Sequence, residues 1–326
     1  MSTLPTIEPA HDEQSSQRFA TRKSTQFSIG ICAAGSAPSL PLIIEEIKAE
    51  KTPTQFVLCR IIVVASACRE QNLFVVKEAA KDDKRIVLVE ENERRGKADA
   101  INKIIDHCEG DFVVFVHSDA FPESGSISIL LESLANNDSA GVASARPFLE
   151  PKKGLTSKLE QLMWLVHNES SLMFNHIGIS NHSNDEMMIV RTSLIRRLPF
   201  GLVNDGAYLA ANAKASGYSI KFCKDARVKI SAPSRIIDSI GQRRRIIFGH
   251  FQIRQLLGKC PSTIESMLLF SPYRSLKILV KTLARNPRLV TVLPVAILNE
   301  ALSLLGALVD TARSTQRHRV WKRYED

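Results

Sequence analysis

The sequence predicts an α/β fold with a mostly parallel sheet flanked by helices. Residues 112–116 are five consecutive apolar residues rich in valine, a pattern typical of a strand that is buried on both faces. From residue 27 onward, strand-like and helix-like segments alternate at the spacing of βαβ units. The composition, with 44% hydrophobic and 24% charged residues, is ordinary for a globular protein.

The individual elements follow from hydrophobic periodicity. Short apolar runs rich in β-branched residues predict strands, and apolar positions spaced by three or four predict helices. The expected strands are residues 27–33, 60–64, 85–89, 111–116, 141–145, 186–190 and 219–223. The expected helices are residues 39–50, 70–81, 94–108, 125–136, 155–174, 205–216, 237–257 and 273–285.

Composition divides the chain into three parts. Residues 1–26 are polar and predict a flexible lead-in, residues 27–258 form the α/β domain, and residues 259–326 form a helical extension. The net charge of +9 is concentrated at the C-terminal end, where residues 227–326 hold 18 Lys and Arg against 6 Asp and Glu. Such a basic end suits nucleic acid, an anionic membrane surface or a phosphate-bearing substrate.

The extension has the pattern of a membrane-associating segment. Residues 273–285 form a basic amphipathic helix, and residues 289–309 are almost wholly apolar. The apolar run is long enough to cross a bilayer, but it contains Glu300, which is costly in lipid. The basic tail carries Trp321 and Tyr324, which suit a membrane interface. We therefore expect a membrane surface as a partner, with spanning and surface-lying arrangements both open.

The strand over residues 111–116 runs into His117-Ser118-Asp119, so a carboxylate stands where the strand leaves the sheet. Ligands of open α/β sheets bind at the carboxyl ends of the strands. A hard carboxylate there suits a divalent cation, which in turn suits a ligand with phosphates. The alternative is a solvated aspartate in an ordinary strand-end turn.

Four motifs in order carry a resemblance to a known family. They are R-x-G-K-x-x-A-x-N at residues 94–102, a D-x-D-like motif at His117–Asp119, an E-D-like motif at Asn204–Asp205 and a Q-x-x-R motif at Gln242–Arg245. Over roughly residues 27–255 the chain resembles the family 2 glycosyltransferases, which have a GT-A fold, a Rossmann-like fold of nucleotide-diphospho-sugar transferases. The sequence departs from the family pattern at His117, Asn204 and Ile246.

The resemblance implies an enzyme that moves a sugar from a nucleotide-sugar donor to an acceptor hydroxyl, with inversion. A divalent metal, Mn²⁺ or Mg²⁺, would be held by Asp119 and would neutralise the departing diphosphate. Asp205 would be the general base, and Glu186 would bind the acceptor. The residues expected to bind the donor are Arg95, Lys97, His117, Asp119, Gln242 and Arg245.

Each of these assignments has a purely structural alternative. Asp205 has a residue type that caps helices, and His117 suits packing as well as ligand contact. The basic residues at 94–97 suit a solvated turn, although Gly96 and the following helix favour an anion site. Arg243, Arg244 and Arg245 suit a diphosphate or lipid headgroups.

Among functions, the leading prediction is a glycosyltransferase at the cytoplasmic side of the membrane, peripheral or single-span, with a lipid-linked or envelope glycan acceptor. A nucleotidyltransferase on a similar sheet is disfavoured because no G-x-G-x-R sequence follows the first strand. A degenerate GT-A domain that binds nucleotide-sugar without turnover remains an alternative. No nucleic acid partner is expected, because few aromatic residues lie among the C-terminal arginines.

Overall fold

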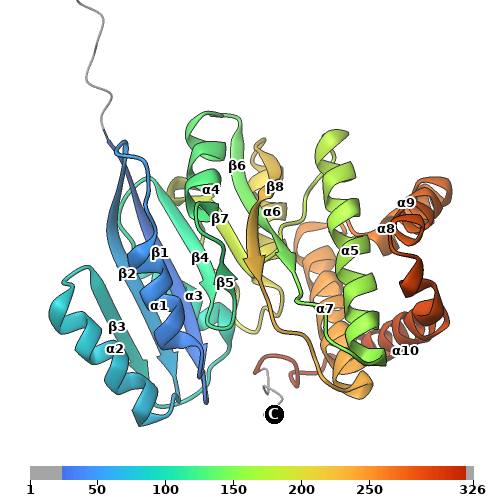
Figure 1. The fold of residues 1–326 in the computed structure, drawn as a ribbon, viewed down its shortest axis with the longest axis horizontal. Helices are drawn as coiled ribbons and strands as arrows, with labels where there is room; N and C mark the ends of the chain where they lie inside the picture. Colours follow the sequence, from blue (N-terminus) through green and yellow to red (C-terminus); the bar gives the residue numbers. More distant parts are fainter. Residues whose placement is uncertain (1–23, 321–326) are drawn as a thin grey trace, which may run out of the picture.

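The computed structural model describes residues 24–320, which form one eight-stranded sheet with helices on both faces (Figure 1). The strand order is β3-β2-β1-β4-β7-β6-β8-β5. The strands are β1 (Thr25–Ala34), β2 (Phe56–Ser66), β3 (Ile86–Glu91), β4 (Phe112–His117), β5 (Phe121–Pro122), β6 (Ala140–Phe148), β7 (Met187–Arg191) and β8 (Ser219–Lys229). The predicted α/β class, a sheet flanked by helices, is confirmed.

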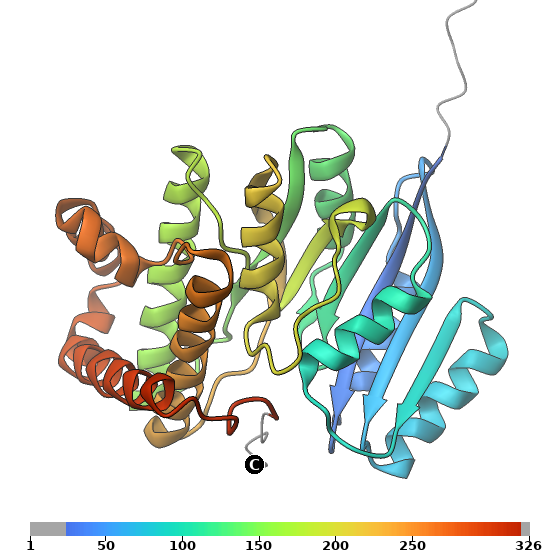
Figure 2. The same ribbon diagram turned by 180° about the vertical axis from the view of Figure 1, so that it is seen from behind.

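Two helical layers cover the sheet (Figures 1 and 2). Residues of α1, α2 and α4 pack in one core, and residues of α3, α6 and α7 pack in the other. The helices are α1 (Leu40–Ala49), α2 (Glu70–Asp82), α3 (Lys97–His107), α4 (Ser126–Ala135), α5 (Leu155–His176), α6 (Asp205–Ala215), α7 (Ile236–Leu257), α8 (Ile264–Phe270), α9 (Pro272–Arg285) and α10 (Leu293–Ala312), with short 3₁₀ turns η1 (Thr192–Leu194) and η2 (Pro287–Val292).

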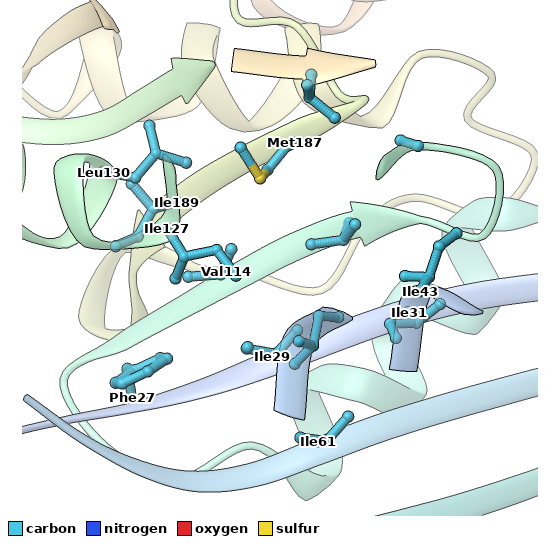
Figure 3. Packing of buried hydrophobic residues seen from close by; sticks show 14 of the residues in the cluster. Phe27, Ile29, Ile31, Ile43, Ile61, Val114, Ile127, Leu130, Met187 and Ile189 are labelled. Atoms are coloured by element: carbon cyan, nitrogen blue, oxygen red, sulfur yellow. The ribbon is translucent and has the colours of Figure 1, made fainter. Parts of the chain in front are cut away.

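Side-chain alternation along the strands supplies both cores. In β4, Val114 packs in the core shared with α1 and α4, while Val113 and Phe115 pack in the core shared with α3 and α6. Figure 3 shows the first of these cores, in which Ile29, Val114, Ile189 and their neighbours come together. A strand buried on both faces therefore needs apolar residues at every position, as the sequence of β4 provides.

The sheet is mixed rather than uniformly parallel. Strand β7 runs antiparallel to both of its neighbours, β4 and β6, and β5 runs antiparallel to β8. The remaining pairs are parallel. Because β7 runs antiparallel to β4, the first residues of β7 lie beside the last residues of β4.

All of the predicted strands and helices occur, with differences at their ends. The helix expected from residue 94 begins at Lys97, because Gly96 has a φ of 105°, which is outside the helical region. Helix α8 was not predicted. The lead-in expected over residues 1–26 lies mostly outside the described residues, as do Trp321 and Tyr324, while Thr25 and Gln26 belong to β1.

Helix α10 packs against α7 with its polar side inward. Asn299, Ser303 and Asp310 are buried, whereas several leucines of the same helix point outward. The segment Pro287–Ala312 is long and apolar enough to cross a membrane, with a mean hydropathy of 2.0, and only 22% of its most apolar part is buried. The C-terminal extension is therefore attached to the α/β domain through both polar contacts and small apolar clusters, and it presents an apolar outer surface.

The chain after α10 turns back toward the carboxyl ends of the strands (Figure 1). The guanidinium of Arg319 stacks over Phe200 at 4.6 Å from the ring centroid. A Cβ placed on Gly96 would lie 2.7 Å from the backbone oxygen of Arg319. The last described residues therefore lie against the start of α3.

Candidate active site

A cavity of about 250 Å³, here called the strand-end cavity, lies where β1, β2 and β4 leave the sheet. Its walls are the first residues of α3, the loop after β4, the two residues before β7 and one side of α7. Val320, from the returning C-terminal segment, completes the lining. The position agrees with the rule that ligands of α/β sheets bind at the carboxyl ends of strands.

A buried ammonium group organises the floor of the strand-end cavity. The Nζ of Lys97 lies 2.6 Å from Oδ2 of Asp185 and 3.0 Å from Oδ2 of Asp205. Nε2 of His117 lies 2.5 Å from the same Nζ and 3.3 Å from Oδ2 of Asp185. The four side chains come from α3, the loop before β7, α6 and β4. We call them the Lys97 cluster.

The acids in and beside the Lys97 cluster have pKa values that are shifted in opposite directions. Burial would raise the pKa of Asp185, but Lys97 and His117 hold it well below its usual range. Burial raises the pKa of Asp205, and the Lys97 charge opposes only part of that effect. Burial, reinforced by the charge of Asp185, raises the pKa of the neighbouring Glu186 to about 7. Carboxyl groups with such separated pKa values are typical of catalytic sites.

Asp205 sits at the start of α6, below the cavity surface. The helix cap is supplied by Asn204, whose side chain accepts a hydrogen bond from the amide of Ala207 at 3.1 Å. The next residue is Gly206, where a Cβ would lie 2.6 Å from Cβ of Asp185, so a larger residue would push α6 away from the cluster. Asp205 therefore does not serve as the side-chain cap, and it points toward Lys97.

The loop after β4 brings His117 and Asp119 to the cavity wall. The backbone amide of His117 donates to the carbonyl of Glu186 at 3.0 Å, which joins the end of β4 to the start of β7. Within residues 24–320, no group of three or more His, Cys, Asp and Glu side chains is arranged to hold a metal ion by itself. Asp119 thus offers one carboxylate to the cavity.

Helix α7 contributes Gln242 and Arg245 to the same cavity. The guanidinium of Arg245 is oriented by the carbonyls of Val203 and His318, at 3.3 and 3.4 Å. The neighbouring arginines point elsewhere, which corrects their expected role with a diphosphate or lipid headgroups. Arg243 pairs with Glu265 and Glu300, and Arg244 pairs with Asp310.

The structure brings most of the predicted site residues together. Those that line the strand-end cavity are Lys97, His117, Asp119, Glu186, Gln242 and Arg245. Arg95 is exposed and, in the described part of the chain, is not among the lining residues, while its neighbour Arg94 is. Asp205 reaches the site only through Lys97.

Sequence reasoning missed the role of Asp185 and the aromatic wall of the site. Asp185 precedes Glu186 in a run of polar residues, and that run was the one available signal. Trp164 lines the cavity from α5, and its ring makes edge contacts with His167, 5.4 Å between centroids. Nothing in the local sequence of α5 distinguishes Trp164 from a core residue.

Comparison with known proteins places the chain in a family. The model of the family described as glycosyl transferase family 2 matches residues 28–198, which is more than half of the chain. The chain therefore belongs to glycosyl transferase family 2. No curated protein sequence matches it significantly.

Among solved structures, one similar protein is the mannosyltransferase PcManGT from Pyrobaculum calidifontis, in complex with GDP-Man and Mn²⁺. The two chains superpose with a TM-score of 0.64 and 19% sequence identity, covering 89% of this chain and 88% of the other. The similarity confirms the GT-A fold.

Family membership and fold together define the protein as a glycosyltransferase, an enzyme of sugar transfer. Membership of a glycosyltransferase family favours sugar transfer over the nucleotidyltransferase alternative. The strand-end cavity, with its basic and acidic groups at the carboxyl ends of the strands, is the candidate active site.

The raised pKa of Glu186 predicts a pH-dependent difference in stability. Glu186 keeps its proton up to about pH 7 when folded but loses it near pH 4.5 when unfolded, so ionisation costs stability as the pH rises between these values. We expect Glu186→Gln to become more stable relative to the wild type by about 1 kcal/mol per pH unit over this window. Urea unfolding of both proteins at pH 5, 6 and 7 measures the difference, and a constant difference would contradict the prediction.

Proposed function

We propose that this glycosyltransferase moves a sugar from a nucleoside-diphosphate donor to an acceptor hydroxyl in the strand-end cavity, with inversion at the anomeric carbon. The observation that carries the proposal is the single cavity that holds Asp119, Arg245 and the acids around Lys97. Cationic groups on one side suit a diphosphate, and carboxylates on the other suit a hydroxyl that must lose its proton.

The donor diphosphate is proposed to lie between the start of α3 and α7. Gly96 and Lys97 place the N-terminal turn of α3 at the cavity, and helix N-termini attract anions. Arg94, before α3, and Arg245, on α7, line the same cavity. GDP-mannose is the first donor to test, because the similar mannosyltransferase was solved with that nucleotide sugar.

A divalent metal is proposed to accompany the diphosphate. Mg²⁺ and Mn²⁺ at such sites take one or two carboxylates and complete their shell with phosphate oxygens and water, so the single carboxylate of Asp119 fits this chemistry. When bound, the ion would neutralise charge on the departing diphosphate.

Glu186 is the base that the geometry favours. It lines both the strand-end cavity and the neighbouring apolar cavity, and its pKa of about 7 suits proton uptake near neutral pH. The acceptor oxygen bonds to the anomeric carbon as the carbon–oxygen bond to the diphosphate breaks. The electron pair of that bond leaves with the diphosphate, and the hydroxyl proton passes to Glu186.

Asp205, the base predicted from the resemblance, has a different position. Its Oδ2 pairs with Lys97, and its side chain is only 4% exposed. In our proposal Asp205 and Asp185 hold the Lys97 ammonium in place, and the acceptor hydroxyl meets Glu186.

We also propose that the enzyme lies on the cytoplasmic surface of a membrane as a peripheral protein. The outward leucines of α10 and the exposed basic residues of α9 form an apolar surface with cationic edges, which suits anionic lipid. Crossing the bilayer would separate Glu300 and Asp310 from Arg243 and Arg244. The six free cysteines agree with a reducing compartment.

Donor binding tests the proposed role of Asp119. Nucleotide-sugars that bind only the folded protein raise its melting temperature, so we expect GDP-mannose with Mn²⁺ or Mg²⁺ to raise it by several degrees and UDP-glucose to serve as the comparison donor. Asp119→Asn should lose the metal-dependent part of the shift, while Asp225→Asn, an exposed acid of β8, should keep it. Equal shifts with and without metal in the wild type would refute the metal role.

Two substitutions separate the candidate bases. We expect Glu186→Gln to lower kcat by about 10²- to 10⁴-fold, the usual contribution of a general base, while the donor-induced melting shift persists. Asp205→Asn should cause a smaller loss, because Asp185 still holds Lys97. The reverse ranking of the two variants would identify Asp205 as the base.

Membrane attachment is tested on the outer face of α10. Leu298 and Leu305 are 58% and 60% exposed, and burying each in lipid is worth about 1.5–3 kcal/mol. We expect Leu298→Asp with Leu305→Asp to weaken flotation with anionic vesicles at least tenfold. Leu42→Asp, at a similarly exposed leucine of α1, is the matched control. Equal flotation of the wild type, the double variant and the control would exclude the α10 surface.

A further inference from the structure

A second cavity, of about 460 Å³, lies among α5, α7, α8, α9 and α10. We call it the apolar cavity, and its volume is typical of a small-molecule site. It shares six lining residues with the strand-end cavity, namely Trp164, Asp185, Glu186, Asn204, Gln242 and Ile246. The two cavities therefore meet at the acids that the proposed chemistry uses.

The apolar cavity leads from those acids to the outer surface of the extension. Its middle is lined by aliphatic side chains such as Leu162, Val166 and Leu279. Its outer rim is formed by Leu268, Leu276 and Ile297, each more than half exposed. A molecule inside would thus have one end at Glu186 and the other end beside the proposed membrane surface.

The polar groups of the apolar cavity do not favour an anionic ligand. Arg243, a cation in its lining, is already paired with Glu265 and Glu300, with Nε 2.7 Å from Oε1 of Glu300. Asp185 and Glu186 stand at the inner end. A phosphate placed there would meet carboxylates, whereas an uncharged hydroxyl would find acceptors.

Three histidines line the same inner region in a chain of edge-to-face contacts. The ring centroids of His182 lie 5.7 Å from His167 and 5.4 Å from His250. Burial keeps these rings uncharged near neutral pH by lowering their pKa values, that of His250 to about 4. Nε2 of His250 is buried and has no hydrogen-bond partner among the described residues.

We propose that the apolar cavity binds the hydrocarbon chain of a lipid acceptor whose head group is uncharged and carries hydroxyls, one of which reaches Glu186. The proposal rests on the proposed sugar transfer and specifies its acceptor class. It commits to a neutral lipid alcohol or glycolipid, and a lipid phosphate is the competing outcome of the test.

Fluorescence of Trp164 provides a direct binding test that needs no sugar transfer. The chain has two tryptophans, so a Trp321→Phe background leaves Trp164 alone at the junction of the cavities. Hexyl glucoside, octyl glucoside and octyl phosphate are titrated below their micelle concentrations. Burial of one methylene strengthens binding about three- to fourfold, so octyl glucoside should bind about tenfold more tightly than hexyl glucoside.

Octyl phosphate should bind at least tenfold more weakly than octyl glucoside. Equal affinity of the two glucosides, or no change in Trp164 fluorescence, would overturn the proposal that the cavity holds a chain. Tighter binding of octyl phosphate would overturn the assignment of an uncharged head group.

A matched pair of substitutions assigns the binding to the cavity. Ala296→Phe fills part of the lining and should reduce the affinity for octyl glucoside at least fivefold, whereas Ala301→Phe, exposed on the same helix, should leave it unchanged. If Ala296→Phe does not fold, Leu276→Glu at the exposed rim replaces it, with the same expected loss. Equal effects of the cavity and control variants would overturn the assignment.

Donor binding, measured separately by the GDP-mannose melting shift, distinguishes the two levels of the proposal. Chain-length-dependent binding without any donor shift would reject the proposed function and retain the lipid site. A donor shift without binding of the glucosides would reject the lipid site alone.

Discussion

The ion pairs of Lys97 are the interaction on which the active site depends. Asp185, Asp205 and Glu186 lie close together in a largely buried region, where carboxylates repel one another and lose hydration. The Lys97 ammonium, 2.6 and 3.0 Å from two of them, makes that arrangement stable. It also fixes the start of α3 to the start of α6 and to the loop before β7. Lys97 pairs with one oxygen of Asp185 and one of Asp205, whereas burial and the charge of Asp185 raise the pKa of Glu186 to about 7.

Helix α10 of the C-terminal extension has an unusual orientation for an apolar helix. Most surface helices bury their apolar side, but α10 buries Asn299, Ser303 and Asp310 and exposes leucines. Two half-buried arginines of α7 explain this, because Arg243 and Arg244 pair with carboxylates from α10 and α8. These ion pairs, together with apolar packing of Ala307 against Ile247 and Phe248, keep α10 beside α7 with its leucines outward.

Much of this fold could be predicted from the sequence because the strands are buried on both faces and the helices are amphipathic. The positions of Lys97, Asp119, Gln242 and Arg245 followed from motif order. The direction of β7 could not be predicted, since a doubly buried strand such as Met187–Arg191 has no pattern that distinguishes parallel from antiparallel pairing. For the same reason the role of Asp185 could not be predicted. Asp185 lies near Lys97 only because β7, which begins two residues later, runs antiparallel to β4.

The C-terminal extension resisted prediction for a different reason. The charge pattern of the C-terminal third suggested that Arg243 and Arg244 of α7 bind phosphate or lipid, but their partners in the extension lie 22 to 66 residues further along the chain. Local periodicity contains no information about pairing over such separations. From the sequence, Glu300 was only a charged residue that would make crossing a bilayer unfavourable. In the structure it forms an ion pair with Arg243.

The return of the chain end to the cavity has a practical consequence for handling the protein. Val320 is part of the cavity wall, and the backbone oxygen of Arg319 occupies the space that a side chain at residue 96 would need. A peptide or fluorescent protein fused after residue 326 would be anchored only six residues from that wall. Strand β1 begins at Thr25, at the end of the strand away from the cavity, so affinity tags and surface tethers belong at the N-terminus (Figure 1).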